Sequence, residues 1–252
     1  MTKAIKIKNI EIGAGLPKIC VPLTGKTQKE LYKEAKAAEE AKADLVEWRA
    51  DFYEDLLEKE ALSETLKGIA EILKEIPLLF TIRTKQEGGS VEISFEDYSN
   101  CNKNAAEAGA DLVDVEVFGE EEKKKALILE LHKTKAVIIA SSHDFFKTDA
   151  CEILLERFQK MDQTGADILK IAVMPQCFED VTAIMCATEK MAASYTERPL
   201  ISMSMGRLGA MSRVYGEAFG SSVTFGTVGA ASAPGQIPVP ELRAMLSLFK
   251  QH

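Results

Sequence analysis

Gly165-Ala166-Asp167-Ile168-Leu169-Lys170 sets a small residue and an aspartate directly before an apolar, β-branched run. The same arrangement stands earlier in the chain, in Ala43-Asp44-Leu45-Val46 and in Gly109-Ala110-Asp111-Leu112-Val113. In two of these segments the glycine occupies a position typical of a helix C-cap. Each segment therefore predicts the end of a helix followed at once by a β-strand.

Counting along each run separates an apolar set from a mostly polar set. Two and four residues past each aspartate, every residue is apolar and suited to face helices: Val46, Trp48, Val113, Val115, Leu169 and Ile171. Three and five residues past it stand Glu47, Arg49, Asp114, Glu116, Lys170 and Ala172. Because strand side chains alternate between faces, this second set is predicted to point into the interior of a barrel.

Short apolar runs recur along the whole chain, separated by segments rich in Ala, Glu, Lys and Leu that are typical of amphipathic helices. Eight such alternations in about the usual length predict an α/β fold, a closed (β/α)8 TIM barrel that spans 1–252 as one domain. The repeated aspartates then precede its second, fourth and sixth strands. The runs lie near residues 18–23, 44–49, 78–83, 112–117, 136–142, 168–174, 200–205 and 222–228.

The first seventeen residues precede the first barrel strand. Their alternation around Gly13 and Gly15 predicts an N-terminal β-hairpin that closes the barrel bottom. Thr27 with Glu30 predicts a capping box at a helix start, and Asp149 with Glu152 forms a weaker pattern of the same kind.

The composition excludes several classes of function. A content of 46% hydrophobic residues supports a folded core, while a formal charge of -8 argues against nucleic acid or an anionic membrane as partner. The five cysteines show no C-x-x-C spacing and the three histidines do not cluster with them, so neither disulfides nor a metal are expected. The charged segment Lys3 to Glu11, with no apolar run of membrane-spanning length, indicates a soluble, cytoplasmic protein.

Lys170 is the first candidate for chemistry. Inside an apolar strand, burial would lower the pKa of its amine and supply the neutral nucleophile that attacks a ketone. The alternative is a structural ion-pair network between Lys170 and Glu47 or Asp114. Both interpretations stay open on the residues alone.

Other candidates follow the predicted strands. His143 ends the fifth strand and suits proton transfer near neutral pH, and Glu87 could orient its imidazole. Arg213 follows the seventh strand and suits a carboxylate, and residues 231–236 have the composition of a lid. A structural histidine, a solvated turn, a surface arginine and an inert loop are the respective alternatives.

Taken together, several segments resemble the type I 3-dehydroquinate dehydratases over nearly the whole chain. One departure is Asp149, where the family's usual proline is expected, and it affects a helix start rather than the chemistry. The matching segments are Glu47-Trp48-Arg49-Ala50-Asp51, Thr81-Ile82-Arg83-Thr84, Glu87-Gly88-Gly89, Ser142-His143-Asp144-Phe145, Lys170-Ile171-Ala172, Ser202-Met203-Ser204-Met205-Gly206, Ser212-Arg213 and Ser232-Ala233-Pro234-Gly235-Gln236-Ile237.

The resemblance implies a shikimate-pathway lyase without cofactor or metal. Lys170 would form an imine with 3-dehydroquinate, and His143, positioned by Glu87, would move the protons that release water and 3-dehydroshikimate. Asp114 would influence the His143 imidazole through the interior network of polar side chains, a role that rests on a weaker part of the resemblance. A homodimer in the cytoplasm is also implied. The substrate-binding residues carried over are Glu47, Arg49, Arg83, Arg213, Ser232, Gln236, Met203 and Phe225.

Two rivals remain from the residues. A class I aldolase uses the same imine on the same fold, but a sugar-phosphate aldolase would be expected to show a phosphate cradle after the last two strands. Here that region offers Arg213 and a Ser/Gln loop, which suit a carboxylate and hydroxyls better. A binding barrel that has kept an old pocket is the other rival.

Overall fold

The structure, a computed structural model, describes residues 2–229 and 235–249. Its strands are β1 (Ile5–Ile7), β2 (Ile10–Ile12), β3 (Lys18–Leu23), β4 (Leu45–Arg49), β5 (Leu78–Thr81), β6 (Leu112–Glu116), β7 (Val137–Asp144), β8 (Ile168–Val173), β9 (Leu200–Ser204), β10 (Val223–Thr227) and β11 (Ile237–Pro238). Its α-helices are α1 (Gln28–Glu40), α2 (Lys59–Leu73), α3 (Phe95–Ala108), α4 (Glu121–Leu131), α5 (Cys151–Asp162), α6 (Phe178–Ser194), α7 (Ala210–Val214), α8 (Gly216–Phe219) and α9 (Val239–Leu248). Two short 3-10 turns, η1 (Ala50–Phe52) and η2 (Lys85–Glu87), follow β4 and β5.

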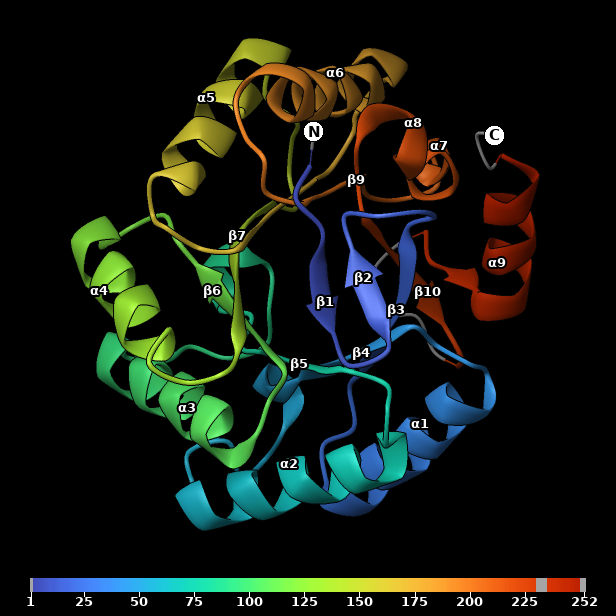
Figure 1. Ribbon diagram of the computed structural model, residues 1–252. Helices are drawn as coiled ribbons and strands as arrows, with labels where there is room; N and C mark the ends of the chain where they lie inside the picture. Colours follow the sequence, from blue (N-terminus) through green and yellow to red (C-terminus); the bar gives the residue numbers. More distant parts are fainter. Residues whose placement is uncertain (1, 230–234, 250–252) are drawn as a thin grey trace.

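Strands β3 to β10 form a closed parallel ring. Each of β3 to β8 pairs with the next strand along the chain, and β10 returns to pair with β3. The ring closes between β9 and β10, where Leu200 bridges to Ser221 and accepts a 2.7 Å hydrogen bond from the amide of Ser222. Figure 1 shows the helices arranged around the outside of this ring. The predicted (β/α)8 barrel is confirmed.

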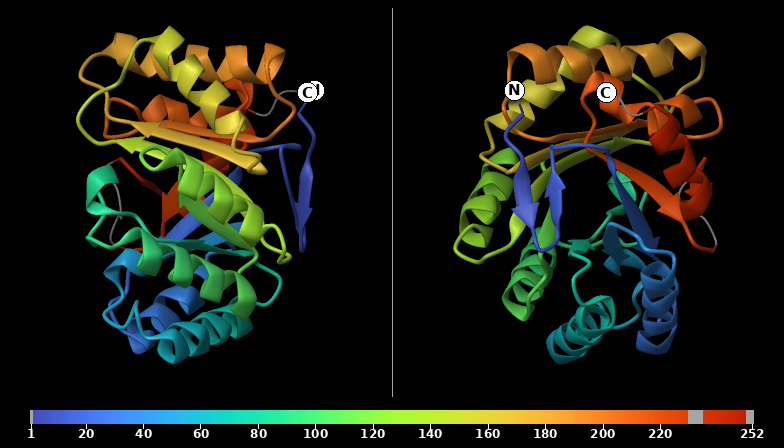
Figure 2. Two further views of the ribbon diagram at one scale, coloured as in Figure 1. Left: turned by 90° about the vertical axis from the view of Figure 1, so that its left-hand side faces the viewer. Right: turned by 45° about the vertical axis from the view of Figure 1, so that its right-hand side comes forward.

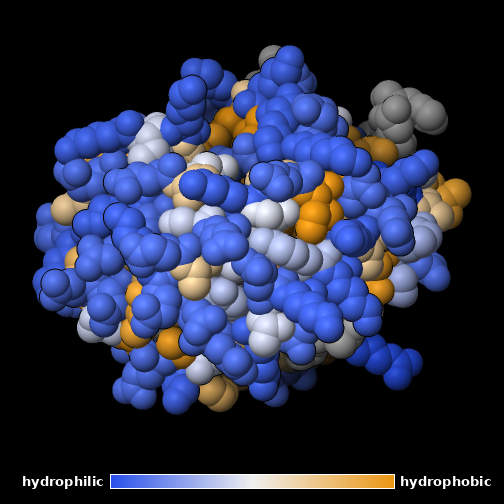
Figure 3. Space-filling model, turned by 90° about the horizontal axis from the view of Figure 1, so that it is seen from below, coloured by the Kyte–Doolittle hydropathy of each residue, from blue (hydrophilic) through white to orange (hydrophobic). Residues whose placement is uncertain are grey.

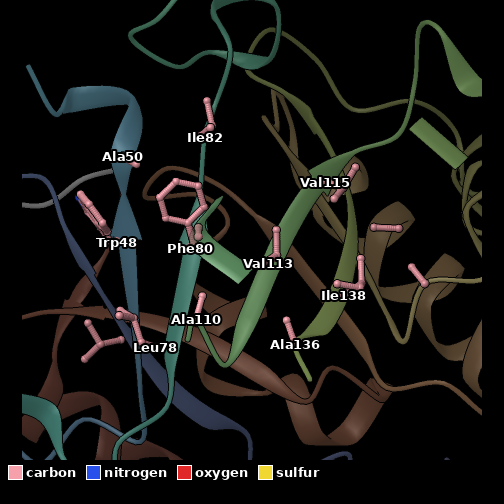
Figure 4. Packing of buried hydrophobic residues seen from close by; sticks show 14 of the residues in the cluster. Trp48, Ala50, Leu78, Phe80, Ile82, Ala110, Val113, Val115, Ala136 and Ile138 are labelled. Carbon is pink, nitrogen blue, oxygen red and sulfur yellow. The ribbon is translucent and has the colours of Figure 1, made fainter. Parts of the chain in front are cut away.

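The apolar set counted from the aspartates packs between the strands and the helices, as predicted. Trp48 is fully buried there and makes edge-to-face contacts with Phe80 and Tyr53, each at 5.4 Å between ring centroids. Figure 4 shows Trp48 with Phe80, Val113 and Val115 in this layer. Because this layer takes up the apolar face of each strand, the opposite face is left for the barrel interior.

The repeated aspartates have a structural role that the sequence did not reveal. Each accepts a hydrogen bond from a main-chain amide near the start of the preceding barrel strand. Asp44 Oδ2 accepts from Ile19 at 2.8 Å, and Asp111 Oδ2 accepts from Leu78 at 2.9 Å. Asp167 Oδ2 accepts from Ile138 at 2.8 Å. The three carboxylates therefore tie neighbouring strands together at their N-terminal ends.

The N-terminal hairpin covers one end of the barrel, as predicted (Figures 1 and 2). Ile7, Ile10 and Ile12 pack against the innermost apolar layer, which includes residues of the barrel strands. The turn is not at the predicted glycines: it lies between β1 and β2, where Lys8 has a φ of 48°. The predicted position of the turn was therefore wrong, and the two glycines follow β2 instead.

Two helix starts were predicted, and one is correct. Thr27 forms the capping box of α1 with Glu30. Asp149 does not cap α5, because Ala150 occupies the N-cap position and no side chain bonds the helix there. Asp149 instead accepts 2.6 Å bonds from Lys147 and Arg157.

Figure 3 views the molecule from below the orientation of Figure 1 and shows a mostly hydrophilic face with apolar side chains scattered over it. Over the residues that the structure describes, none of the helices has both the length and the apolar character needed to cross a membrane.

Candidate active site

Lys170 lies in the middle of β8 and points into the barrel, where it is 3% exposed. Its Nζ is 3.3 Å from Glu47 Oε1 on β4 and 3.2 Å from Asp114 Oδ2 on β6. The ring of Phe225 lies beside it, with its centroid 4.8 Å from Nζ. The three alternate strands thus bring together the polar side chains that strand alternation predicted. The ion pairs considered as the alternative are present, and Lys170 and Glu47 also line a cavity.

Asp114 is held between two cations. Arg83 Nη2 donates to Asp114 Oδ1 at 2.8 Å, and the Ser141 hydroxyl donates to the same oxygen at 2.6 Å. Burial would raise the pKa of Asp114, but Arg83 and Lys170 outweigh it and hold the pKa below its usual range. Asp114 is therefore a buried anion that fixes the position of the Lys170 amine.

Arg83 connects several carboxylates. Besides Asp114, its Nη1 donates to Glu116 Oε1 at 2.9 Å and lies 3.5 Å from Glu87 Oε2. Although burial opposes the charged form, these carboxylates raise the pKa of Arg83 well above its ordinary value. Because protein carboxylates contact the Arg83 guanidinium on several sides, its role in the site is to hold these acidic side chains in place.

His143 is oriented by Glu87. Glu87 Oε2 lies 2.9 Å from His143 Nδ1 and accepts a 2.9 Å hydrogen bond from the main-chain amide of the same residue. Because this oxygen is already an acceptor, we assign the ring proton to Nδ1, which leaves the lone pair on Nε2. The predicted pairing of the two side chains is present in the structure.

The pKa values of this pair move in opposite directions. Burial, followed by the charges of Arg83 and Lys170, lowers the pKa of His143 well below 6.5. Burial, followed by the Glu116 carboxylate, raises the pKa of Glu87 to about 8. The imidazole is therefore neutral near pH 7 and is ready to accept a proton.

The Gly88-Gly89 turn explains how Glu87 reaches His143. Gly88 has a φ of 80°, and a Cβ there would come within 2.3 Å of the Phe145 ring. A Cβ on Gly89 would lie 1.9 Å from the Arg83 carbonyl oxygen. Only glycine fits this close return of the chain, which carries Glu87 back toward the end of β7.

Arg213 is 1% exposed, so the surface alternative for it is wrong. It lies on α7, whose start packs closely on the end of β9: a Cβ on Gly209 would fall 2.2 Å from the Ser204 carbonyl. Arg213 Nη1 approaches the Phe225 carbonyl at 3.5 Å, and burial lowers the pKa of Arg213 to about 10. A desolvated guanidinium of this kind binds a planar anion well.

These side chains meet in one cavity. It includes Gln236, while Ser232, predicted beside it, lies outside the described residues. A separate groove lined by Thr84, Tyr98 and Lys124 contains neither the amine nor the imidazole, so the first cavity is the candidate site. Its lining consists of Glu47, Arg49, Arg83, His143, Phe145, Lys170, Ala172, Met203, Met205, Arg213, Phe225 and Gln236.

Sequence reasoning missed several residues that build this cavity. Asp51 accepts hydrogen bonds of 2.7 and 2.9 Å from Arg49. Counting alternate positions along β4 does not reach Asp51, because the strand ends at Arg49. Ser141 stands two residues before His143, so strand alternation could have placed it on the same inner face. Phe145 and Met205 lie just past the ends of β7 and β9, where the two-residue alternation of a strand no longer predicts which way a side chain points.

A closed parallel barrel with a buried amine and a buried imidazole in one cavity near the strand ends defines the class of (β/α)8-barrel enzymes. Comparison with known families refines that class. The family model for type I 3-dehydroquinase matches residues 19–252, and the chain belongs to this family.

Individual relatives agree. The chain is 45% identical over 250 residues to the 3-dehydroquinate dehydratase of Klebsiella pneumoniae, with 99% of this chain and all of that protein covered. It is 44% identical over 253 residues to the 3-dehydroquinate dehydratase of Bacillus licheniformis, with both chains fully covered. The solved type I 3-dehydroquinate dehydratase from Clostridium difficile, with covalently modified comenic acid, superposes with a TM-score of 0.94 at 43% identity, covering 98% of each chain.

Proposed function

We propose that this chain dehydrates 3-dehydroquinate to 3-dehydroshikimate through an imine on Lys170. The observation that carries the proposal is the single cavity that holds Lys170 between Glu47 and Asp114 and also includes His143, backed by Glu87. Membership of the type I family supports the reaction, which belongs to the shikimate pathway to aromatic amino acids.

Lys170 is the proposed nucleophile. Its nitrogen attacks the substrate ketone, and loss of water from the carbinolamine gives an imine that acidifies the adjacent carbon. Glu47 and Asp114 fix the nitrogen on one side, and the Phe225 ring lies beside it. The covalently modified ligand of the Clostridium difficile relative is consistent with such covalent chemistry.

His143 is the proposed proton carrier. As a neutral base, Nε2 removes the proton from the carbon next to the imine, and the resulting imidazolium returns a proton to the departing hydroxyl. Water leaves, and hydrolysis of the product imine regenerates the Lys170 amine. Glu87 stabilises the transient imidazolium because its carboxyl oxygen lies 2.9 Å from Nδ1.

The remaining residues bind the substrate. Arg213 takes the carboxylate, while Glu47 and Arg49 meet the ring hydroxyls. Arg83 acts through the carboxylates that it binds, since Asp114 and Glu116 occupy its guanidinium.

Apolar side chains and the last loop complete the pocket. Met203 and Phe225 pack against the ring of the substrate. Gln236, with Ser232, closes the pocket over the substrate and excludes water from the imine.

We further propose a cytoplasmic homodimer in which residues 1–252 of each chain form one domain. The cysteines that the structure describes are free thiols, which suits a reducing compartment. Several large apolar side chains, including Leu208, Met211 and Tyr215, are exposed on or next to α7 and are available for a subunit contact. Neither a metal nor an organic cofactor takes part in the proposed steps, since the amine and imidazole supply the chemistry.

The direct test is the growth of ultraviolet absorbance when 3-dehydroquinate is added, because the product is a conjugated enone. Steady growth that saturates with substrate is expected. No absorbance change with 3-dehydroquinate, while a sugar phosphate is cleaved, would instead indicate an aldolase. No turnover of either would indicate a binding barrel.

A further inference from the structure

Two cysteines outside the cavity lie unusually close together. Cys151 is the first residue of α5 and Cys186 lies midway along α6, and their sulfur atoms are 3.0 Å apart. A disulfide bond joins sulfurs at about 2.05 Å. The two thiols are therefore within roughly 1 Å of bonding distance while α5 and α6 keep their packing.

The pair is accessible from solvent. Cys186 is exposed and Cys151 is partly exposed. Neither residue lines the cavity that holds Lys170. Lys190 on α6 interacts with both thiols, and its ammonium group also lies 3.6 Å from Glu152 on α5. A small oxidant in solution can reach this site without entering the barrel.

We propose that Cys151 and Cys186 form a thiol modification site that closes to an intramolecular disulfide on reaction with a low-molecular-weight disulfide such as oxidised glutathione. One protein thiolate attacks a sulfur of the reagent, forming a mixed disulfide and releasing one glutathione thiolate. The second protein thiolate then attacks the protein sulfur of the mixed disulfide and releases the other. Two thiols lose two protons and two electrons, and the reagent is reduced to two thiols.

The surroundings assign an order to the two steps. Cys186 is the more exposed thiol and meets the reagent first. Burial and the adjacent Cys186 thiol raise the pKa of Cys151, although Lys190 acts in the opposite direction. Cys151 is therefore the resolving thiol, and its 3.0 Å separation from Cys186 makes the second step intramolecular and fast.

The bond would join two neighbouring helices of the outer layer. It would close the chain between residues 151 and 186, and cross-links over loops of this length stabilise a fold mainly by restricting the unfolded chain. For a protein of this size, we expect the unfolding midpoint to rise by roughly 5–10 °C on oxidation.

The test uses the full-length chain carrying Cys177→Ser. This substitution removes the exposed Cys177, a competing thiol, and places a serine hydroxyl, which caps helices well, at the N-cap of α6. The protein is equilibrated with oxidised glutathione and analysed by intact mass, peptide mapping and thermal unfolding. The matched controls add either Cys186→Ser or Cys151→Ser.

The expected product has lost two hydrogen atoms, gives a peptide joining Cys151 to Cys186, and unfolds at a higher temperature that dithiothreitol reverses. The Cys186→Ser control should show neither the linked peptide nor the shift. Stable mixed disulfides with glutathione at both positions, or two free thiols after equilibration, would overturn the proposal. So would a linked peptide that involves Cys20 or Cys101 instead.

Discussion

Glu87→Gln should change how the stability of the protein depends on pH. The Glu87 carboxyl is largely buried, and burial together with Glu116 raises its pKa to about 8, against an ordinary value of about 4.5. Between these two values the folded chain holds one more proton than the unfolded chain. This proton stabilises the fold fully below pH 4.5, and the stabilisation is lost as the pH rises toward 8.

The magnitude follows from one proton. A single extra bound proton gives a slope of about 1.4 kcal/mol per pH unit. From pH 6.5 to 8.0, where the native group begins to ionise, the integrated loss is about 2 kcal/mol. His143 does not contribute in this window. Because folding lowers its pKa, its protonation reduces the stability only as the pH falls through 6.5 and below.

The assay is urea unfolding of wild type and Glu87→Gln at constant ionic strength across this window. The unfolding free energy of wild type minus that of Glu87→Gln should fall by about 2 kcal/mol as the pH rises, because the amide does not titrate. Glu92→Gln is the matched control from the same loop, since its side chain is 88% exposed, and it should run parallel to wild type. Parallel curves for wild type and Glu87→Gln would refute the reasoning about the buried pair.

Three further variants test the proposed roles. His143→Ala should slow turnover by about two to four orders of magnitude while the imine on Lys170 still forms; near-normal turnover would return His143 to a structural role. Arg213→Ala should cost roughly 2–4 kcal/mol in kcat/KM, and an unchanged kcat/KM would remove the carboxylate role. Gln236→Ala should raise KM and lower kcat/KM without preventing borohydride trapping; wild-type kinetics would make this loop a passive one.

The barrel was predictable because its pattern is local. Asp44, Asp111 and Asp167 mark strand starts, and the period of two then assigns each following side chain to the helices or to the interior. All eight predicted strands are present among the described residues, and only their ends shift by one or two residues. The hairpin turn was misplaced because a left-handed residue at Lys8, rather than a glycine, reverses the chain.

The site was predictable only in part. Alternation brought Glu47, Asp114 and Lys170 to one interior layer, but it could not supply the network that neutralises them. That network depends on Arg83, which follows β5 and forms ion pairs with Asp114 and Glu116 on the neighbouring strand β6. Long-range contacts of this kind depend on how the ring closes, and no local period encodes them. The residues alone suggested Glu87 as the partner of His143 and Arg213 as a carboxylate site, and the family resemblance supported both roles. The glycine turns beside them explain their positions physically.

The most direct measurement is borohydride reduction in the presence of 3-dehydroquinate, followed by intact mass and peptide mapping. Wild type should gain the mass of a reduced substrate adduct on the peptide containing Lys170, and Lys170→Ala should show neither the adduct nor turnover. Lys147→Ala, which removes an exposed lysine in the β7–α5 loop, should behave as wild type. An adduct at wild-type yield in Lys170→Ala would contradict the central claim that this amine is the covalent catalyst.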